Sequence, residues 1–165
     1  MVRLRKLEPS DLPFLYRWEN DAAVWADSDT HNPLSQQDLR SYIENTTGDI
    51  YRDGQLRLII ENDTDHSTLG CVDLFDFDPR NRKAAIGLYI APEARRSRVG
   101  YETMKLLEQY AFGTLNMRLL YAVIRASNGA CLALYQSLGY EQIAVLPQWT
   151  LESEAYLLVK YKVSI

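Results

Sequence analysis

The alternation of apolar and polar residues along the chain predicts a series of short strands. Residues 2–7 alternate Val, Leu and Leu with Arg, Arg and Lys, which is typical of a strand with one buried face. Residues 84–91 are instead almost continuously apolar, as in a strand that is covered on both faces. The remaining strands lie between turn residues and are predicted at residues 56–61, 68–77, 119–124, 140–146 and 155–163.

Apolar residues at helical spacing predict helices between these strands. One helix begins at residues 9–11 with Ser10 as its N-cap, and a second begins with a capping box from Ser35 to Asp38. The segment between them, residues 20–33, is polar and aromatic, and we expect a loop or a broken helix there. The order of strands and helices indicates one mixed α/β sheet with helices on its faces. The predicted helices span about residues 9–19, 35–45, 99–112 and 127–138.

Composition narrows the class of protein. The chain has 165 residues, 47% of them apolar and 24% charged, and is expected to form one soluble domain over residues 1–165. Its net charge of −4 gives no general reason to expect nucleic-acid binding. No apolar run approaches the roughly 18 residues of a membrane span, and we expect a cytoplasmic protein. Two cysteines, Cys71 and Cys131, lack metal-ligand spacing and are expected to be buried free thiols, with no metal bound.

The charge is unevenly distributed. Residues 80–98 hold six basic side chains and one acid, so this segment carries +5 and the rest of the chain −9. Its last part, residues 95–101, lies between a strand pattern and a helical pattern. The first amides of a helix have no intrahelical acceptors, and the helix dipole favours negative charge there. Arginines add bidentate phosphate contacts, so this turn points to a ligand with a pyrophosphate; taken alone, a solvated basic face explains it equally well.

Two motifs together resemble a known family, the GNAT N-acetyltransferases. In that family a central strand leads into a loop of the form Gln/Arg-x-x-Gly-x-Gly/Ala and then into a helix. Arg95 stands at the first position of this loop and Gly100 at the last, while Arg98 stands where the middle glycine is usual. Residues 128–140 resemble the family's Asn-x-x-Ala-x-x-x-Tyr-x-x-x-Gly-Phe segment, with Tyr135 at the tyrosine. Within the family, the chain looks closest to the branch of spermidine and ribosomal-protein N-terminal acetyltransferases.

This resemblance implies a fold and a cofactor. The fold is an α/β (α+β) domain with a single mixed, mostly antiparallel twisted sheet of six to seven strands and about four helices on its faces. The cofactor is acetyl-CoA: the loop amides hold its pyrophosphate, while the central strand and the asparagine of the second motif contact its pantetheine arm. The residues implied to bind acetyl-CoA are Leu88, Ile90, Ala91, Arg95, Arg96, Ser97, Arg98, Val99, Gly100, Tyr101, Asn128 and Tyr135.

The resemblance also implies how the reaction is catalysed. Acetyl transfer to an amine requires that the amine lose a proton and that the leaving thiolate gain one. Tyr135 is the candidate acid, because a phenol is protonated at neutral pH, although its place on an apolar stripe by itself favours core packing. Many relatives carry a glutamate where this chain has Ala85, so Asp73 on the preceding strand is the candidate base, with a water chain as the alternative. No nucleophilic residue is evident, and we expect direct attack by the amine in a ternary complex.

The amine is expected to bind between the first pair of helices and the last pair of strands. Carboxylates and aromatic rings in these regions attract a cation by charge and by cation–π contact. They suit a polyamine, another small amine such as an aminoglycoside, or a peptide N-terminus, without choosing among them. The candidate acceptor-binding residues are Asp27, Asp29, His31, Asp73 and Trp149, with Glu152 and Glu154 in the same late segment.

Two other interpretations stay open. One is a non-catalytic acyl-CoA-binding or regulatory module on the same fold, which Arg98 and Ala85 motivate. The other is an unrelated phosphate- or nucleotide-binding domain, although the chain lacks a Walker lysine–serine pair and a full GxGxxG motif. The sequence does not fix the oligomeric state, and the late strands, which often pair in dimers of the family, leave a homodimer open.

Overall fold

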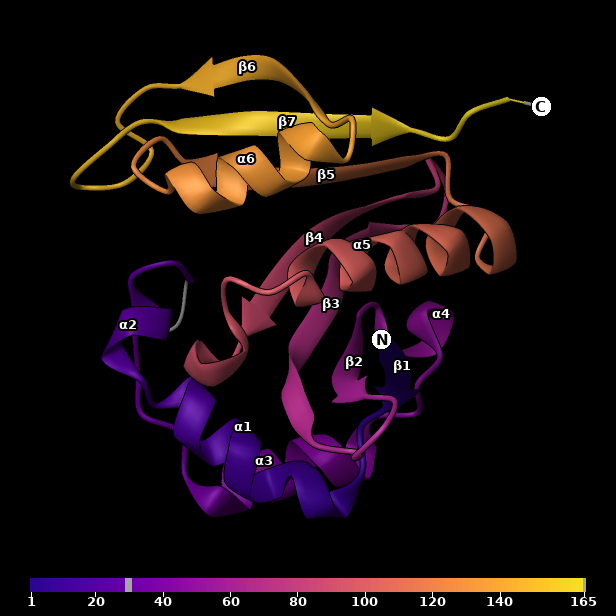
Figure 1. Cartoon of the computed structure of the whole chain (residues 1–165), viewed down its shortest axis with the longest axis vertical. Helices are drawn as coiled ribbons and strands as arrows, with labels where there is room; N and C mark the ends of the chain where they lie inside the picture. The colour runs from indigo at the N-terminus through magenta and orange to yellow at the C-terminus, as the bar shows by residue number, and fades with distance from the viewer. Residues whose placement is uncertain (29–30, 165) are drawn as a thin grey trace.

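A computed structural model describes residues 1–28 and 31–164. Within these residues seven strands form one sheet in the order β1-β2-β3-β4-β5-β7-β6 (Figure 1). In this described part, β4 and β5 are the one parallel pair and all other neighbours are antiparallel. The predicted mixed, mostly antiparallel sheet is therefore confirmed. The strands are β1 (Val2–Lys6), β2 (Leu56–Asn62), β3 (Thr68–Asp78), β4 (Lys83–Ile90), β5 (Leu119–Arg125), β6 (Glu141–Leu146) and β7 (Ala155–Tyr161).

The helices cover the sheet from both sides. On one face, Leu15 of α1 and Leu39 of α3 pack with Ile59 and Cys71 of the sheet. On the other face, α5 and α6 pack on a larger core that includes Leu58, Val72 and Leu120. Figure 1 shows the α1–α3 hairpin over β1 to β4, while α6 lies along β5 and β7. The helices are α1 (Leu12–Glu19), α2 (Ala22–Trp25), α3 (Gln36–Asn45), α4 (Ile50–Asp53), α5 (Val99–Glu108) and α6 (Gly129–Ser137).

The start of the first helix differs from its prediction. The chain enters it through a 3₁₀ turn, Pro9–Asp11, whose N-cap is Glu8 and not Ser10. The Glu8 amide donates to Asp11 Oδ2 at 2.8 Å, and the same carboxylate accepts two hydrogen bonds from Arg5. Asp11 is thus drawn under the turn by Arg5 of β1, six residues earlier in the chain, and Ser10 is left exposed.

Other differences are smaller. The capping box at Ser35 forms as predicted, and residues 20–33 contain the short helix α2. The helix predicted over residues 99–112 changes after Glu108 into a π-helical turn, Gln109–Thr114, and α4 was not predicted. Cys71 is a buried free thiol as expected, whereas Cys131 is only half-buried.

The sheet opens between its two central strands. β4 and β5 pair with each other only at Lys83–Leu119, Ala84–Leu120 and Ala85–Tyr121. Beyond these pairs β4 continues to Ile90 and β5 to Arg125 without pairing to each other, and we call the opening between them the fork. Figure 1 shows the two strands diverging toward the ends that carry the loops before α5 and α6. The prediction that residues 84–91 are covered on both faces is therefore correct for 84–86 and wrong for 87–90, which are half-exposed along this fork.

No helix in the described part of the chain combines the length and the hydropathy that a membrane span requires.

Candidate active site

The basic turn lies at the open end of β4. After the buried Ala91, a 3₁₀ turn of residues 92–94 leads into residues 95–98, and α5 begins at Val99. Arg96 has the left-handed φ of 60°, which turns the backbone sharply. The amides of Arg96, Ser97 and Arg98 donate to no backbone acceptor within residues 1–28 and 31–164. Together with the first amides of α5 they form a site suited to an anion.

The arginines of this turn are anchored by the protein itself. Arg95 Nε donates to the Ile90 carbonyl at 2.9 Å, and its guanidinium lies 5.9 Å from the ring of Tyr89. Arg98, at the N-cap of α5, has an ordinary φ of −76° and lies over the ring of Tyr101. The chain therefore accommodates arginine where the family has glycine without backbone strain. All three arginines, Arg95, Arg96 and Arg98, are exposed and leave guanidinium donors facing solvent.

Gly100 brings the turn against α6. A Cβ atom at this position would lie 3.2 Å from Leu134 Cδ2 and 3.9 Å from Leu88 Cδ2, so the missing side chain lets the start of α5 approach these two leucines closely. The end of β4, the start of α5 and one face of α6 thus meet at the fork. Asn128 caps α6 by accepting a hydrogen bond from the Cys131 amide at 3.2 Å. Its contact with pantetheine stays a prediction.

Tyr135 lies on the inner face of α6. Its side chain is buried and its ring packs edge-on against Tyr140, with ring centroids 4.9 Å apart. Burial raises the pKa of Tyr135 well above its usual value. The phenol is consequently protonated at neutral pH, as an acid for a leaving thiolate must be, while its core contacts are those of a structural tyrosine. Which of the two roles it has stays a prediction.

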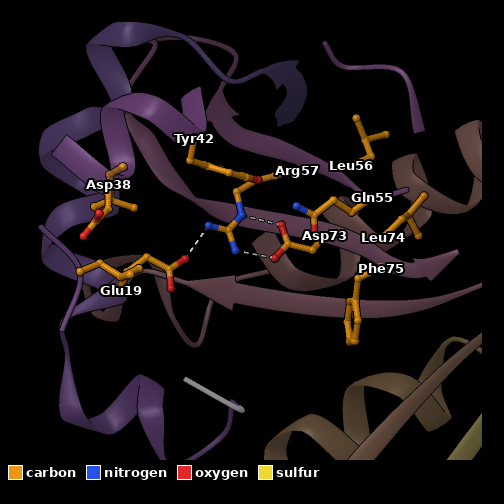
Figure 2. Close-up of a pocket in the computed structure, with 11 residues that line it drawn as sticks. Glu19, Asp38, Tyr42, Gln55, Leu56, Arg57, Asp73, Leu74 and Phe75 are labelled. Carbon is orange, nitrogen blue, oxygen red and sulfur yellow. Dashed lines mark hydrogen bonds and ion pairs between the residues drawn. The ribbon is translucent and has the colours of Figure 1, made fainter. Parts of the chain in front are cut away.

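A pocket of about 290 Å³ lies on the opposite face of the sheet, beneath the α1–α3 hairpin. Figure 2 shows Arg57 of β2 at its centre, between Asp73 of β3 and Glu19 of α1. Arg57 Nε donates to Asp73 Oδ1 at 2.8 Å and its Nη2 to Asp73 Oδ2 at 2.7 Å, while Nη1 donates to Glu19 Oε1 at 2.5 Å. The lining residues are Glu19, Leu34, Asp38, Leu39, Tyr42, Gln55, Leu56, Arg57, Asp73, Leu74 and Phe75.

This pocket is negative overall. Three carboxylates, on Glu19, Asp38 and Asp73, face one guanidinium, which leaves two negative charges. Burial by itself lowers the pKa of Arg57, but the charges around it, led by that of Asp73, raise it well above its usual value. Arg57 is therefore a permanent cation inside an anionic pocket. Its guanidinium also lies 5.8 Å from the ring centroid of Tyr42, within cation–π range.

Gly87 connects this pocket to the fork. It pairs with Asp73 across the β3–β4 ladder and lies two residues beyond the last β4–β5 pair. A Cβ atom built at Gly87 would lie 3.5 Å from Phe75 Cε1 and 3.9 Å from Asp73 Oδ2. The Asp73 carboxylate thus lies beside the diverging part of β4. Ala85, two residues earlier on the same strand, is buried and carries no acid.

The other acceptor-binding candidates are not part of the pocket. Asp27 forms an ion pair with Arg125 at the end of β5. Trp149 is 59% exposed in the connection between β6 and β7, and Glu154 accepts a hydrogen bond from the Tyr156 hydroxyl. His31 does not line the pocket, and Asp29 lies outside the described residues. Of the predicted set, only Asp73 is placed there.

Five charged or aromatic lining residues were not predicted: Glu19, Asp38, Tyr42, Arg57 and Phe75. A signal was available for one of them. Arg57 interrupts the apolar strand 56–60, and the hairpin turn at residues 62–67 pairs it with Asp73. The two helical acids carried no comparable signal, because their surroundings depend on how the α1–α3 hairpin docks.

The comparisons with known proteins agree with this geometry. Residues 2–141 match the family model described as an acetyltransferase (GNAT) domain. The chain belongs to the GNAT acetyltransferase family. This confirms the predicted enzyme class, N-acetyltransferase, with coenzyme A as its cofactor.

Similar proteins come from one branch of the family. Spermidine N(1)-acetyltransferase of Escherichia coli K12 is 27% identical over 142 residues, which are 84% of this chain and 72% of that protein. The fold matches a crystal structure of spermidine N-acetyltransferase from Vibrio cholerae in complex with CoA and spermine, with a TM-score of 0.88, 20% identity and coverage of 97% and 95% of the two chains. Another structure of the V. cholerae enzyme is dodecameric (TM-score 0.82, 21% identity, 97% and 93% coverage).

Proposed function

We propose that this protein transfers the acetyl group of acetyl-CoA to a primary amine of a cationic acceptor, and that a polyamine is the acceptor class. The observation that carries the proposal is the negative pocket around Glu19 and Asp73, next to the fork between β4 and β5. The spermidine acetyltransferases that resemble the chain support the same acceptor. A neutral or anionic acceptor would find two uncompensated negative charges there.

The fork fits acetyl-CoA by its donor set. The free amides of residues 96–98, the first turn of α5 and the exposed guanidinium groups of Arg95 and Arg98 would hold the pyrophosphate. Residues 87–90 of β4 pair with β3 on one side only, and the side that faces β5 would bind the pantetheine arm beside α6. When bound, acetyl-CoA supplies a thioester, an acyl group activated for attack by an amine.

The residues of the pocket would bind the amine, and Tyr135 of α6 would protonate the leaving thiolate. Arg57 binds both oxygens of Asp73, so we assign Asp73 to attracting and orienting the acceptor ammonium. We assign removal of the ammonium proton to a water chain that leads to solvent. The Tyr135 Oη–H would donate its proton to the departing thiolate. The amine attacks directly, without an acetylated residue.

An acceptor screen tests the proposal. Acetyl-CoA is incubated with spermidine, spermine, an aminoglycoside and a short peptide, and release of the CoA thiol is measured. We expect turnover with the polyamines and kcat/KM values lower by an order of magnitude or more for the other acceptors. Saturable binding of CoA without thiol release for any amine would instead identify a non-catalytic acyl-CoA-binding module.

A single substitution tests the assigned acid. Tyr135→Phe should lower kcat about 10²- to 10⁴-fold, because general acid catalysis by one positioned group contributes this much. The Kd for CoA, measured by titration calorimetry, should stay within about twofold. Wild-type kcat in this variant would leave Tyr135 with its structural role alone. The oligomeric state, for which the sequence leaves a homodimer open, is tested separately by the mass of the protein in solution.

A further inference from the structure

Arg57 is an unusual component for a pocket that binds cations. It lies at the centre of the pocket, between two carboxylates and against the ring of Tyr42 (Figure 2). We propose that Arg57 is a positioning residue that sets acceptor specificity: it orients Glu19 so that the free Glu19 Oε2 receives a second ammonium group of the acceptor. This inference rests on the proposed function and names the residues that would distinguish a polyamine from a monoamine.

The geometry fixes both carboxylates. The planar guanidinium binds Asp73 through two parallel hydrogen bonds, which allow one orientation of that carboxylate. Its third contact, from Nη1 to Glu19 Oε1, brings an acid of α1 to an acid of β3. The Glu19 and Asp73 side chains are only 16% and 25% exposed, so neither rotates freely into water.

The hydrogen bonds leave particular oxygens open. Asp73 uses both of its oxygens on Arg57, whereas Glu19 uses only Oε1, and Glu19 Oε2 has no donor among the described residues. The third acid, Asp38, is exposed, and its Oδ2 accepts from the Ser35 amide that begins α3. Glu19 Oε2 is therefore the oxygen of this half-buried carboxylate pair that Arg57 leaves open to an outside donor.

Charge explains why an arginine would be needed. Without Arg57, three carboxylates would surround one pocket, and their repulsion would separate the α1–α3 hairpin from the sheet. With Arg57, Glu19 and Asp73 are held close together while the pocket keeps two negative charges. An acceptor with one ammonium group would need only the side near Asp73 and the fork. An acceptor with a second ammonium group would also gain the contact with Glu19 Oε2.

The chain contains a matched control. Arg5 of β1 binds Asp11 through two parallel hydrogen bonds of 2.9 and 2.8 Å and also contacts Glu61, as Arg57 binds Asp73 and Glu19. Neither acid of the Arg5 cluster lines the pocket, and both are buried. A change at Arg5 therefore reports what loss of such a cluster does to the fold alone.

The experiment compares Arg57→Lys, Glu19→Gln and Arg5→Lys with the wild type on two acceptors, spermidine and the monoamine n-butylamine. Lysine keeps the charge of arginine but has no planar fork to hold two carboxylates. We expect Arg57→Lys and Glu19→Gln to raise the KM for spermidine tenfold or more, with kcat within threefold. The KM for n-butylamine should rise by a clearly smaller factor than the KM for spermidine, because a monoamine does not reach Glu19, and Arg5→Lys should leave both KM values unchanged.

The outcomes separate this inference from the proposed function. Wild-type protein that acetylates neither amine would overturn both. A wild type that acetylates spermidine, with variants that lose spermidine and n-butylamine in equal proportion, would overturn only the assignment of Arg57 and Glu19. If Arg5→Lys raised the KM for spermidine as much as Arg57→Lys does, the rise would reflect a general loss of stability, and the assignment of Arg57 and Glu19 would be overturned as well. Melting temperatures of all variants establish that folded protein is compared, and the near-isosteric Glu19→Gln keeps the test valid if Arg57→Lys folds poorly.

Discussion

The same ionic arrangement occurs twice on one face of the sheet. In both clusters an arginine on a strand binds an aspartate through two parallel hydrogen bonds and a glutamate through a third contact. In the Arg5 cluster the side chains of Asp11 and Glu61 are 1% and 6% exposed, whereas Glu19 and Asp73 of the Arg57 cluster are 16% and 25% exposed. The second cluster borders a pocket. Exposure to a pocket, and not the residue types, therefore separates the Arg5 cluster from the Arg57 cluster, for which we propose a function.

Their places in the fold explain the difference. The Arg5 cluster ties the edge strand β1 to the 3₁₀ turn at Pro9–Asp11 and to β2, so its charges join three backbone segments. Its pairing is strong enough that Asp11, through its hydrogen bond, raises the pKa of Arg5 above its usual value. The Arg57 cluster joins β2, β3 and α1 beside the fork. There a ligand can replace the water that the pocket admits.

The largest expected effects come from removing one aspartate charge in each cluster. Asp11→Asn should cost about 3–5 kcal/mol of unfolding free energy, because it removes the charge of a buried carboxylate and leaves Arg5 with Glu61 as its remaining acidic partner. Asp73→Asn should cost about 1–2 kcal/mol, since pocket water solvates the exposed part of the pair. Asp73→Asn should also lower kcat/KM for spermidine about 30- to 100-fold, because the acceptor loses one charged hydrogen bond. Urea unfolding and steady-state kinetics measure the two quantities.

The two substitutions are controls for each other. Asp11→Asn, assayed where circular dichroism shows it folded, should keep the wild-type kcat/KM. If Asp11→Asn and Asp73→Asn shift stability and kcat/KM in the same ratio, the two clusters do not differ in function and the comparison fails.

The sequence predicted the fold well because its signals are local. Alternation marked the strands, and the Ser35 capping box marked α3. The basic turn at residues 95–98 was also visible, since a strand end, three arginines and a helix start are contiguous in the chain, while its binding of a pyrophosphate stays a prediction. Ser10 failed as an N-cap because Asp11 is held by Arg5, six residues earlier on β1, and the capping pattern does not contain this pairing of side chains.

The acceptor pocket was predicted only in part for the same physical reason. Asp73 was proposed from the resemblance to the family, and its partner Arg57 follows from the register of the β2–β3 hairpin. Glu19 reaches them only because α1 docks on that hairpin. Asp27 and Trp149 had the right chemistry, but Asp27 pairs with Arg125 and Trp149 faces solvent. Acidic and aromatic residues identify a kind of site, whereas helix docking determines which of them converge.

A smaller effect is expected in the acid stability of the Arg5 cluster. Hydrogen bonds, the largest from Arg5, lower the pKa of Glu61 from 4.5 to about 2. A carboxylate with a depressed pKa stabilises the fold above its unfolded pKa, and this contribution is lost as the pH falls from about 4.5 toward 2. Glu61→Gln should therefore be less stable than the wild type by about 1–2 kcal/mol at pH 7 and nearly equal to it at pH 2, after allowing for screening by solvent. Urea midpoints across this range test the prediction, and a constant difference would show that the Glu61 charge adds no stability.

The smallest effect should come from the aromatic partner that the two clusters do not share. Tyr42 lies under Arg57, whereas no ring lies within cation–π range of Arg5 in the described part of the chain. A partly exposed cation–π contact contributes about 0.5–1 kcal/mol, so Tyr42→Leu should raise the KM for spermidine about two- to fivefold by loosening Arg57. Burial raises the pKa of Tyr42, so its hydroxyl is neutral, and Tyr42→Phe, which keeps the ring, should stay within about twofold of the wild type. If Phe and Leu raise the KM equally, the hydroxyl acts directly on the acceptor, and Arg57 is held by its carboxylates alone, as Arg5 is.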